Sequence, residues 1–250
     1  MALKSINELN ALAAAALKAH GASDSMARAT AKYLVAADLQ GLATHGTMRV
    51  ASYCGHLGVK RADGSAVPKI VNEKSAACLI DAGNGLGFEA CEMAVAQAVA
   101  RARTQGMGFA GVTNSHHCGA LGILLEPVAA AGMVGLAFSN ASSAIMPWGG
   151  TRAIFGTNPV AAVFGRKNAP PIVVDLSLTQ VTRGQIMLNV KEGKLIPDGW
   201  GMDKDGKPTN DAQKILVGGS LYAVGGLKGT MLALAVELIC CALTGAALSH

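Results

Sequence analysis

The stretch TNSHHCGALG, residues 113–122, places two adjacent histidines, His116 and His117, beside Cys118. Histidine and cysteine are the usual zinc ligands, and histidine is also the usual acid and base of enzymes that work near neutral pH. A zinc site needs three or four converging ligands, and the other histidines form no H-x-x-x-H or H-E-x-x-H pattern. No metal site is therefore expected. Spacing alone leaves open whether these histidines transfer protons or are merely solvated or core residues.

A second pair of polar residues lies in the stretch THGTMR. His45 and Arg49 are four residues apart, so they share one face of the helix predicted for residues 45–57, with Thr44 as its N-cap. An arginine can hold a carboxylate with two parallel hydrogen bonds while an imidazole handles a proton. The alternative is a helix whose polar residues face water, and spacing alone favours that alternative.

Two glycine-rich turns could approach a phosphate. The first contains Gly83, Gly85 and Gly87, but Phe88 stands where the pattern G-x-G-x-x-G needs glycine, and no acidic residue ends the next strand. We therefore interpret it as a turn without a Rossmann site. The second turn, VGGLKGT, places Lys228 at the start of a helix, where free amides, the helix dipole and the ammonium group form an anion site. Its alternative is a helix cap with an exposed lysine.

The composition is that of a compact α/β protein. The chain has 250 residues, enough for one large domain or two small ones, and 51% of them are hydrophobic. A disordered chain would be poor in such residues. The net charge of +5 comes from scattered basic residues, which excludes the basic clusters of a nucleic-acid-binding protein.

Cysteine usage and hydropathy bear on where the chain works. The six cysteines form no C-x-x-C pair and predict free thiols in a reducing compartment, the cytoplasm. Lys4, Asn7 and Glu8 interrupt the N-terminal stretch, so no signal peptide is expected. The apolar stretch 229–249 is long enough to span a membrane, but Glu237 near its middle is unfavourable in lipid. A buried core helix is the expectation there.

The expected elements alternate along most of the chain. Ser5 and Glu8 form a capping box for a first helix that ends at Gly21, and a second helix runs from Ser23 or Ser25 to Gly41. Further on, the patterns predict strands at 75–81, 108–114, 133–139, 160–164 and 171–175, and helices at 86–106, 120–131, after Thr179 and from about 229, with a polar loop at 196–209. This alternation indicates an α/β sheet fold.

Six segments together resemble the type 2 malate/L-lactate dehydrogenase family, which includes sulfolactate and ureidoglycolate dehydrogenases, diketogulonate reductase and reductases of cyclic imino acids. They are ADLQGLATHGTMR, TNSHHCGALG, MPWGGTRAIFGTNPVA, PIVVDLSLTQVTRGQI, IPDGWGMDKDGKPT and GGLKGTMLALAVELICCALTGAALS, which occur in the family's order over nearly the whole chain. The resemblance implies N-terminal helices followed by a mixed-sheet, non-Rossmann nicotinamide-binding fold. It also implies a homodimer.

The resemblance divides the chain into an N-terminal helical and catalytic part, residues 1–118, and a cofactor-binding part, residues 119–250. It implies a further C-terminal segment that this sequence lacks. The family's catalytic positions fall on Thr44, His45 and His117, not His116. Its substrate-binding positions fall on Arg49, Thr157 and Asn158. Its cofactor-contacting positions fall on Ser139, Asn140, Ala141, Asp175, Leu176, Ser177, Lys228 and Gly229.

The implied activity is hydride transfer, with NAD or NADP, between the nicotinamide and C2 of a small 2-hydroxy or 2-oxo acid. An imidazole with a pKa near the working pH would supply the proton, from either His45 or His117. One alternative is a reductase of cyclic imino acids, although Gln185 stands where those enzymes carry an aspartate. The other alternative is a non-catalytic remnant of the family.

Overall fold

The structure is a computed structural model that describes residues 3–249 and divides into two compact units. The first unit comprises the residues up to Gly135 together with Ala162–Val173. The second comprises Leu136–Ala161 and the residues from Val174 onward. Each unit contains helices and strands, and together they form the α/β, mixed-sheet fold expected from the sequence.

The first unit begins with the helices α1 (Ile6–Ala19) and α2 (Asp24–Leu39), which pack against each other. The predicted capping box is confirmed, because the Ser5 hydroxyl accepts from the Glu8 amide while the Glu8 carboxylate accepts from the Ser5 amide. Ser23 caps α2 in a similar way. Leu17 and Leu34 are fully buried, so apolar packing holds the two helices together.

The helix predicted for residues 45–57 begins later than expected. Two short 3-10 turns, η1 (Ala43–His45) and η2 (Thr47–Arg49), precede α3 (Val50–Gly58). The Asp38 carboxylate accepts hydrogen bonds from the amide and hydroxyl of Thr47, while Gly46 is extended with ψ −158°. A Cβ on Gly46 would lie only 1.7 Å from Asp38 Oδ1. This tertiary contact interrupts the helix between His45 and Arg49.

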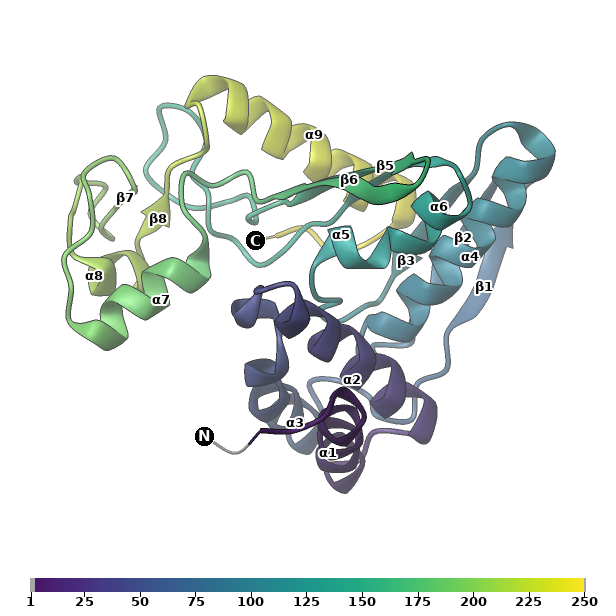
Figure 1. The fold of residues 1–250 in the computed structure, drawn as a ribbon. Helices are drawn as coiled ribbons and strands as arrows, with labels where there is room; N and C mark the ends of the chain where they lie inside the picture. The colour runs from purple at the N-terminus through teal and green to yellow at the C-terminus, as the bar shows by residue number, and fades with distance from the viewer. Residues whose placement is uncertain (1–2, 250) are drawn as a thin grey trace. The chain divides into compact units, whose positions relative to one another are not determined.

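The first sheet has the order β1-β2-β3, with β1 at Lys69–Glu73, β2 at Ala77–Asp81 and β3 at Phe109–Thr113. β1 and β2 are antiparallel, whereas β2 and β3 are parallel and joined by α4 (Phe88–Gln105). Figure 1 shows α4 lying along this sheet. β1 was not expected from the sequence, because all five of its residues are exposed and give no buried periodicity.

Two short helices, α5 (Leu121–Leu124) and α6 (Glu126–Ala130), replace the single helix predicted for 120–131. The break falls at Leu125, and Pro127 lies in the first turn of α6, where its missing amide hydrogen is tolerated. The second sheet has the order β4-β5-β6, with β4 at Val134–Phe138, β5 at Val160–Arg166 and β6 at Ala169–Leu176. Each of these three strands contains residues of both units.

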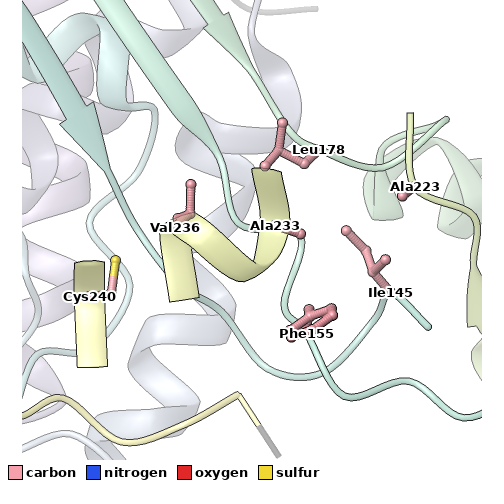
Figure 2. Close-up of a cluster of buried hydrophobic side chains, with 7 residues drawn as sticks. All are labelled: Ile145, Phe155, Leu178, Ala223, Ala233, Val236 and Cys240. Carbon is pink, nitrogen blue, oxygen red and sulfur yellow. The ribbon is translucent and has the colours of Figure 1, made fainter. Parts of the chain in front are cut away.

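The second unit contains α7 (Arg183–Glu192), β7 (Gly201–Met202), α8 (Ala212–Leu216), β8 (Ser220–Leu221) and α9 (Leu227–Thr244). Its main apolar cluster lies along one side of α9, as Figure 2 shows. The members are Ile145, Phe155, Leu178, Ala223, Ala233, Val236 and Cys240. Loops and strand ends far apart in the sequence therefore pack on this one helix.

α9 is long and apolar enough to cross a membrane by length and composition. Ala233, Val236 and Cys240 nevertheless face the apolar cluster, and Glu237 is only 4% exposed. Core packing on this side agrees with the expectation from the sequence. On the other side, Leu238 is 53% exposed.

Candidate active site

The glycine turn between β2 and α4 supports the histidine loop. The Asn84 amide donates to Asn114, the Gly87 amide donates to His117, and the His116 amide donates to Gly85. A Cβ on Gly87 would lie 2.6 Å from the His116 carbonyl oxygen, so only glycine fits there. The amides of Asn84 and Gly87 are thus engaged with the loop and are not free for a phosphate.

The Nδ1 atom of His117 accepts hydrogen bonds. The backbone amide of Gly119 donates to it over 3.1 Å, and the Tyr53 hydroxyl lies 2.6 Å from it. An amide can only donate, so Nδ1 carries its lone pair and the neutral ring carries its proton on Nε2. Tyr53 is only 1% exposed and therefore holds a fixed position. His117 presents an N–H donor at its other ring nitrogen.

Burial makes the neutral form of His117 strongly preferred. Desolvation lowers its pKa to about 3, and the positive charge of Arg49 and the neighbouring histidines add to the effect. Burial likewise lowers the pKa of His116 to about 4, with smaller contributions from His56 and Arg61. The sequence suggested an imidazole with a pKa near the working pH. In the structure, His117 is instead a neutral hydrogen-bond donor.

The structure brings four of the predicted site residues together in the first unit. The rings of His45 and His117 stack with their centroids 5.8 Å apart. The Thr44 hydroxyl lies 3.1 Å from His45 Nδ1, and Arg49 Nε donates to the Thr44 carbonyl over 2.6 Å. The two 3-10 turns therefore present an imidazole and a guanidinium beside His117 even though no continuous helix carries them.

Sequence reasoning missed Tyr53 as a site residue. It is four residues beyond Arg49 and eight beyond His45 in a predicted helix, which is the spacing that could have indicated a shared face. Its partner is 64 residues away, so only tertiary structure reveals the hydrogen bond. A further ring contact joins His56 to His116, with centroids 4.7 Å apart.

The lowered histidine pKa values predict a pH-dependent stability. His117 takes up a proton at about pH 6.5 when unfolded but only at about pH 3 when folded. Between these values the unfolded chain binds one more proton, so the free energy of unfolding falls by about 1.4 kcal/mol per pH unit as the pH drops. His116 acts in the same direction. Urea denaturation between pH 6.5 and 4.5 measures this slope.

A His117→Gln variant serves as the comparison, because glutamine keeps a polar side chain but does not titrate. We expect its stability to depend less steeply on pH than that of the wild type over the same range. Identical slopes for the two proteins would contradict the buried, neutral state of His117.

The segments expected to contact the cofactor lie in the second unit. Asn140 donates through Nδ2 to the Ala247 carbonyl, and Ser139 donates its hydroxyl hydrogen to the Asn140 carbonyl, which fixes this turn. Ala141, Asp175 and Leu176 are exposed, while Ser177 is half-buried with its hydroxyl 2.8 Å from that of Thr179. The first segment follows the end of β4, and the second consists of the last two residues of β6 and the residue after it, at positions that a ligand can reach.

Lys228 and Gly229 lie in the first turn of α9. Gly226 is the N-cap with a positive φ of 63°, and no side chain caps this end. A Cβ on Gly229 would lie 1.9 Å from the Val224 carbonyl oxygen, so the close turn requires glycine. The first-turn amides, the helix dipole and the exposed ammonium of Lys228 are the groups of the anion site that the sequence predicts at this helix start.

Thr157 and Asn158 differ in their surroundings. Thr157 is half-buried and accepts through its carbonyl from the Leu178 amide. Asn158 is fully buried with a φ of +40°, and its Nδ2 donates to the Ala233 carbonyl and to Glu237 Oε2, each over 2.9 Å. The Asn158 side chain is therefore directed at α9.

The buried carboxylate of Glu237 is well supplied with donors. Burial opposes its ionisation, but hydrogen bonds from Ser249, Asn158 and Cys241 hold its pKa below the usual value. Both the amide and the hydroxyl of Ser249 donate to it. A charged group therefore joins the 157–158 turn, α9 and the segment after α9 within the second unit.

Solved structures with this fold are dehydrogenases and reductases. The delta1-piperideine-2-carboxylate reductase from Pseudomonas syringae pvar. tomato is 34% identical with a TM-score of 0.97, over 100% of this chain and 75% of that one. The malate dehydrogenase from Entamoeba histolytica is 29% identical with a TM-score of 0.93, over 98% of this chain and 72% of that one. The fold and the histidine–arginine site thus define an oxidoreductase.

The chain belongs to the malate/L-lactate dehydrogenase family, whose model matches residues 4–250. It is 41% identical to the (2R)-3-sulfolactate dehydrogenase (NADP(+)) of Chromohalobacter salexigens over 96% of this chain and 72% of that protein. It is 35% identical to a Delta(1)-pyrroline-2-carboxylate/Delta(1)-piperideine-2-carboxylate reductase of Pseudomonas putida, over 95% of this chain and 70% of that protein. The family expected from the sequence is confirmed, and it is a family of nicotinamide-dependent enzymes.

Proposed function

We propose that this enzyme transfers a hydride between NAD(P) and C2 of a small 2-hydroxy or 2-oxo acid such as malate, lactate or sulfolactate. The observation that carries the proposal is the grouping of Arg49, His45 and His117. It combines a carboxylate-binding group with two imidazoles in one small region. The nicotinamide supplies the hydride when it is bound.

Arg49 holds the substrate carboxylate. Its Nε is engaged with the Thr44 carbonyl, which orients the guanidinium and leaves its terminal NH2 groups to pair with the carboxylate oxygens. His117 then donates from Nε2–H to the oxygen on C2, because Tyr53 and Gly119 occupy its Nδ1. His45, stacked beside it and hydrogen-bonded to Thr44, is the second candidate for holding the transferred proton.

Substrate binding also changes the electrostatics of His117. The charge of Arg49 is one of the causes that lower the pKa of His117. A carboxylate bound to Arg49 offsets that charge, so it raises the pKa of His117 toward the range useful for acid–base catalysis. Protonated His117 carries a second hydrogen, on Nδ1, so the Gly119 amide no longer donates to Nδ1 and the Tyr53 hydroxyl accepts from it. Transfer of the Nε2 proton to the substrate oxygen then returns His117 to its neutral form.

The catalytic role is thus assigned to residues within 1–118 and the cofactor role to residues within 119–250. For the cofactor we propose Ser139, Asn140, Ala141, Asp175, Leu176, Ser177, Lys228 and Gly229. The exposure of several of these residues and the amide-rich start of α9 support this assignment. Thr157 is proposed to face the substrate, whereas Asn158 acts by holding the 157–158 turn against α9.

Reduction of a cyclic imino acid, such as a piperideine- or pyrroline-2-carboxylate, is a second candidate. The fold match at a TM-score of 0.97 to a piperideine-2-carboxylate reductase favours it. The same Arg49 would bind the carboxylate, and the proton would go to nitrogen instead of oxygen. Gln185, in the first turn of α7, stands where the cyclic imino-acid reductases carry an aspartate. This difference favours 2-oxo acids as the substrates.

Ligand-induced stabilisation and a substrate screen test the proposal together. We expect NADH or NADPH to raise the melting temperature, since a ligand that binds only the folded state stabilises it. Cofactor oxidation with pyruvate, oxaloacetate, sulfopyruvate, diketogulonate and piperideine-2-carboxylate then identifies the substrate class. The proposal is rejected, and a non-catalytic form is favoured, if millimolar cofactor gives no melting shift and no substrate is turned over.

We further propose a homodimer in the cytoplasm that binds neither nucleic acid nor a membrane. None of the six cysteines, all of which lie within residues 3–249, forms a disulfide, which supports a reducing compartment. Exposed leucines on α9, including Leu232 at 55% exposure, support a protein contact at that face.

A further inference from the structure

The second unit contains a cavity of about 260 Å³ that none of the assigned residues lines. Its wall is formed by the loop from Ser143 to Ala153, the start of α7 and the turn between α8 and β8. Pockets for whole drug-sized ligands measure about 300–1,000 Å³. The cavity is slightly smaller than such pockets, so it has room for one part of a larger ligand.

Two arginines, and no aspartate or glutamate, are among the described residues that line this cavity. Both Arg152 and Arg183 are exposed, and among residues 3–249 neither takes part in an ion pair or a side-chain hydrogen bond. Two neighbouring guanidinium groups without counter-charges repel each other, so an anion placed between them is strongly favoured. The cavity wall thus has the charge of an anion site.

The start of α7 and the cavity floor strengthen this charge. Arg183 is the first residue of α7, a ten-residue helix, so the positive end of the helix dipole lies at the cavity. The floor consists of Ile186, Ile215 and Leu221, each no more than 5% exposed. Water is excluded from that side, which makes ionic hydrogen bonds above it stronger than in bulk solvent.

We propose that Arg152 and Arg183 bind a tetrahedral oxyanion, a phosphate ester or a sulfonate, carried by a ligand of this enzyme. The guanidinium fork matches such oxygens with paired hydrogen bonds, and the Ser143 hydroxyl at the wall adds a further donor. The inference rests on the proposed function, because that function supplies two ligands with such a group. They are the 2′-phosphate that distinguishes NADP from NAD and the sulfonate of a sulfonated 2-hydroxy acid.

Chain continuity favours the 2′-phosphate. Ser143 follows the 139–141 segment by two residues, Arg183 follows the 175–177 segment by six, and Leu221 precedes Lys228 by seven. Each segment proposed to contact the cofactor therefore continues into a wall of the cavity. The cavity would accordingly determine the preference for NADP.

Isothermal titration calorimetry with unreactive probes tests the proposal. The probes are adenosine 2′,5′-bisphosphate against AMP, and 3-sulfolactate against lactate, with the wild type, Arg152→Gln, Arg183→Gln and Lys191→Gln. Lys191→Gln removes the same charge from the same helix outside the cavity. We expect the wild type to bind one phosphorylated or sulfonated probe at least about tenfold more tightly than its partner.

Loss of that preference in both arginine variants, with Lys191→Gln unchanged, supports the site. If the arginine variants lose the preference for the bisphosphate over AMP, the site binds the cofactor. If they lose the preference for sulfolactate over lactate, the site binds the substrate. Arg183→Lys, which keeps the charge but not the fork, should retain an intermediate preference. Equal preferences in wild type and arginine variants overturn the proposal. Missing turnover would count against the proposed function alone, since these titrations need no catalysis.

Discussion

His117→Ala is expected to lower kcat for 2-oxo acid reduction by about 10²- to 10⁴-fold, the usual contribution of a positioned acid or base. The expectation follows from the geometry of Nδ1, which Tyr53 and Gly119 occupy, so that only Nε2–H faces outward to a substrate oxygen. Steady-state kinetics with the substrate found in the screen measures kcat and KM. KM should change little, because Arg49 still holds the carboxylate.

Tyr53→Phe is the matched comparison for that experiment. It removes the hydroxyl but keeps the ring that packs on Phe88, and the Gly119 amide still fixes Nδ1. We therefore expect a smaller loss, about tenfold in kcat, with a shifted pH profile because one donor to the imidazole is gone. A kcat for His117→Ala equal to that of the wild type would transfer the proton-donor role to His45.

Asn158→Ala should lower the free energy of unfolding by about 2–4 kcal/mol. The substitution removes two hydrogen bonds from a fully buried amide and takes one donor from the buried Glu237 carboxylate. Urea denaturation measures the change. A substrate-binding role of the side chain would instead raise KM and leave stability nearly unaltered, so the two readouts separate the roles.

Asn168→Ala provides the control for backbone conformation. Asn168 also has a positive φ, 56°, but is exposed in the turn between β5 and β6. Both substitutions place alanine in a conformation that disfavours it, whereas only Asn158→Ala disrupts buried hydrogen bonds. Equal destabilisation of the two variants would show that backbone strain, not the link to α9, explains the effect.

Local signals in the sequence predicted a large part of the fold. The capping box at Ser5 and Glu8 and the glycine stops at Gly21 and Gly41 depend on neighbouring residues, and the structure confirms those elements. The start of α3 could not be predicted in this way. The Asp38 side chain that interrupts the helix belongs to a different helix, and its effect requires the tertiary fold.

The candidate site was predictable in its residue types but not in its chemistry. The grouping of His45, Arg49 and His117 was expected from the resemblance to a family. Spacing alone left the role of each residue open. The tautomer and low pKa of His117 depend on burial and on Tyr53, which is far away in sequence. Such properties arise only when the chain is folded.

The three strands that belong to both units have a topological consequence. The chain crosses between units at Gly135–Leu136, Ala161–Ala162 and Val173–Val174, each time inside a strand. The units are thus linked by three covalent connections instead of one linker. A single proteolytic cut in the 140–157 loop lies between two crossings and leaves all three intact, and the two fragments remain joined because β4 of one pairs with β5 of the other. Neither unit can be obtained as one contiguous piece of the gene.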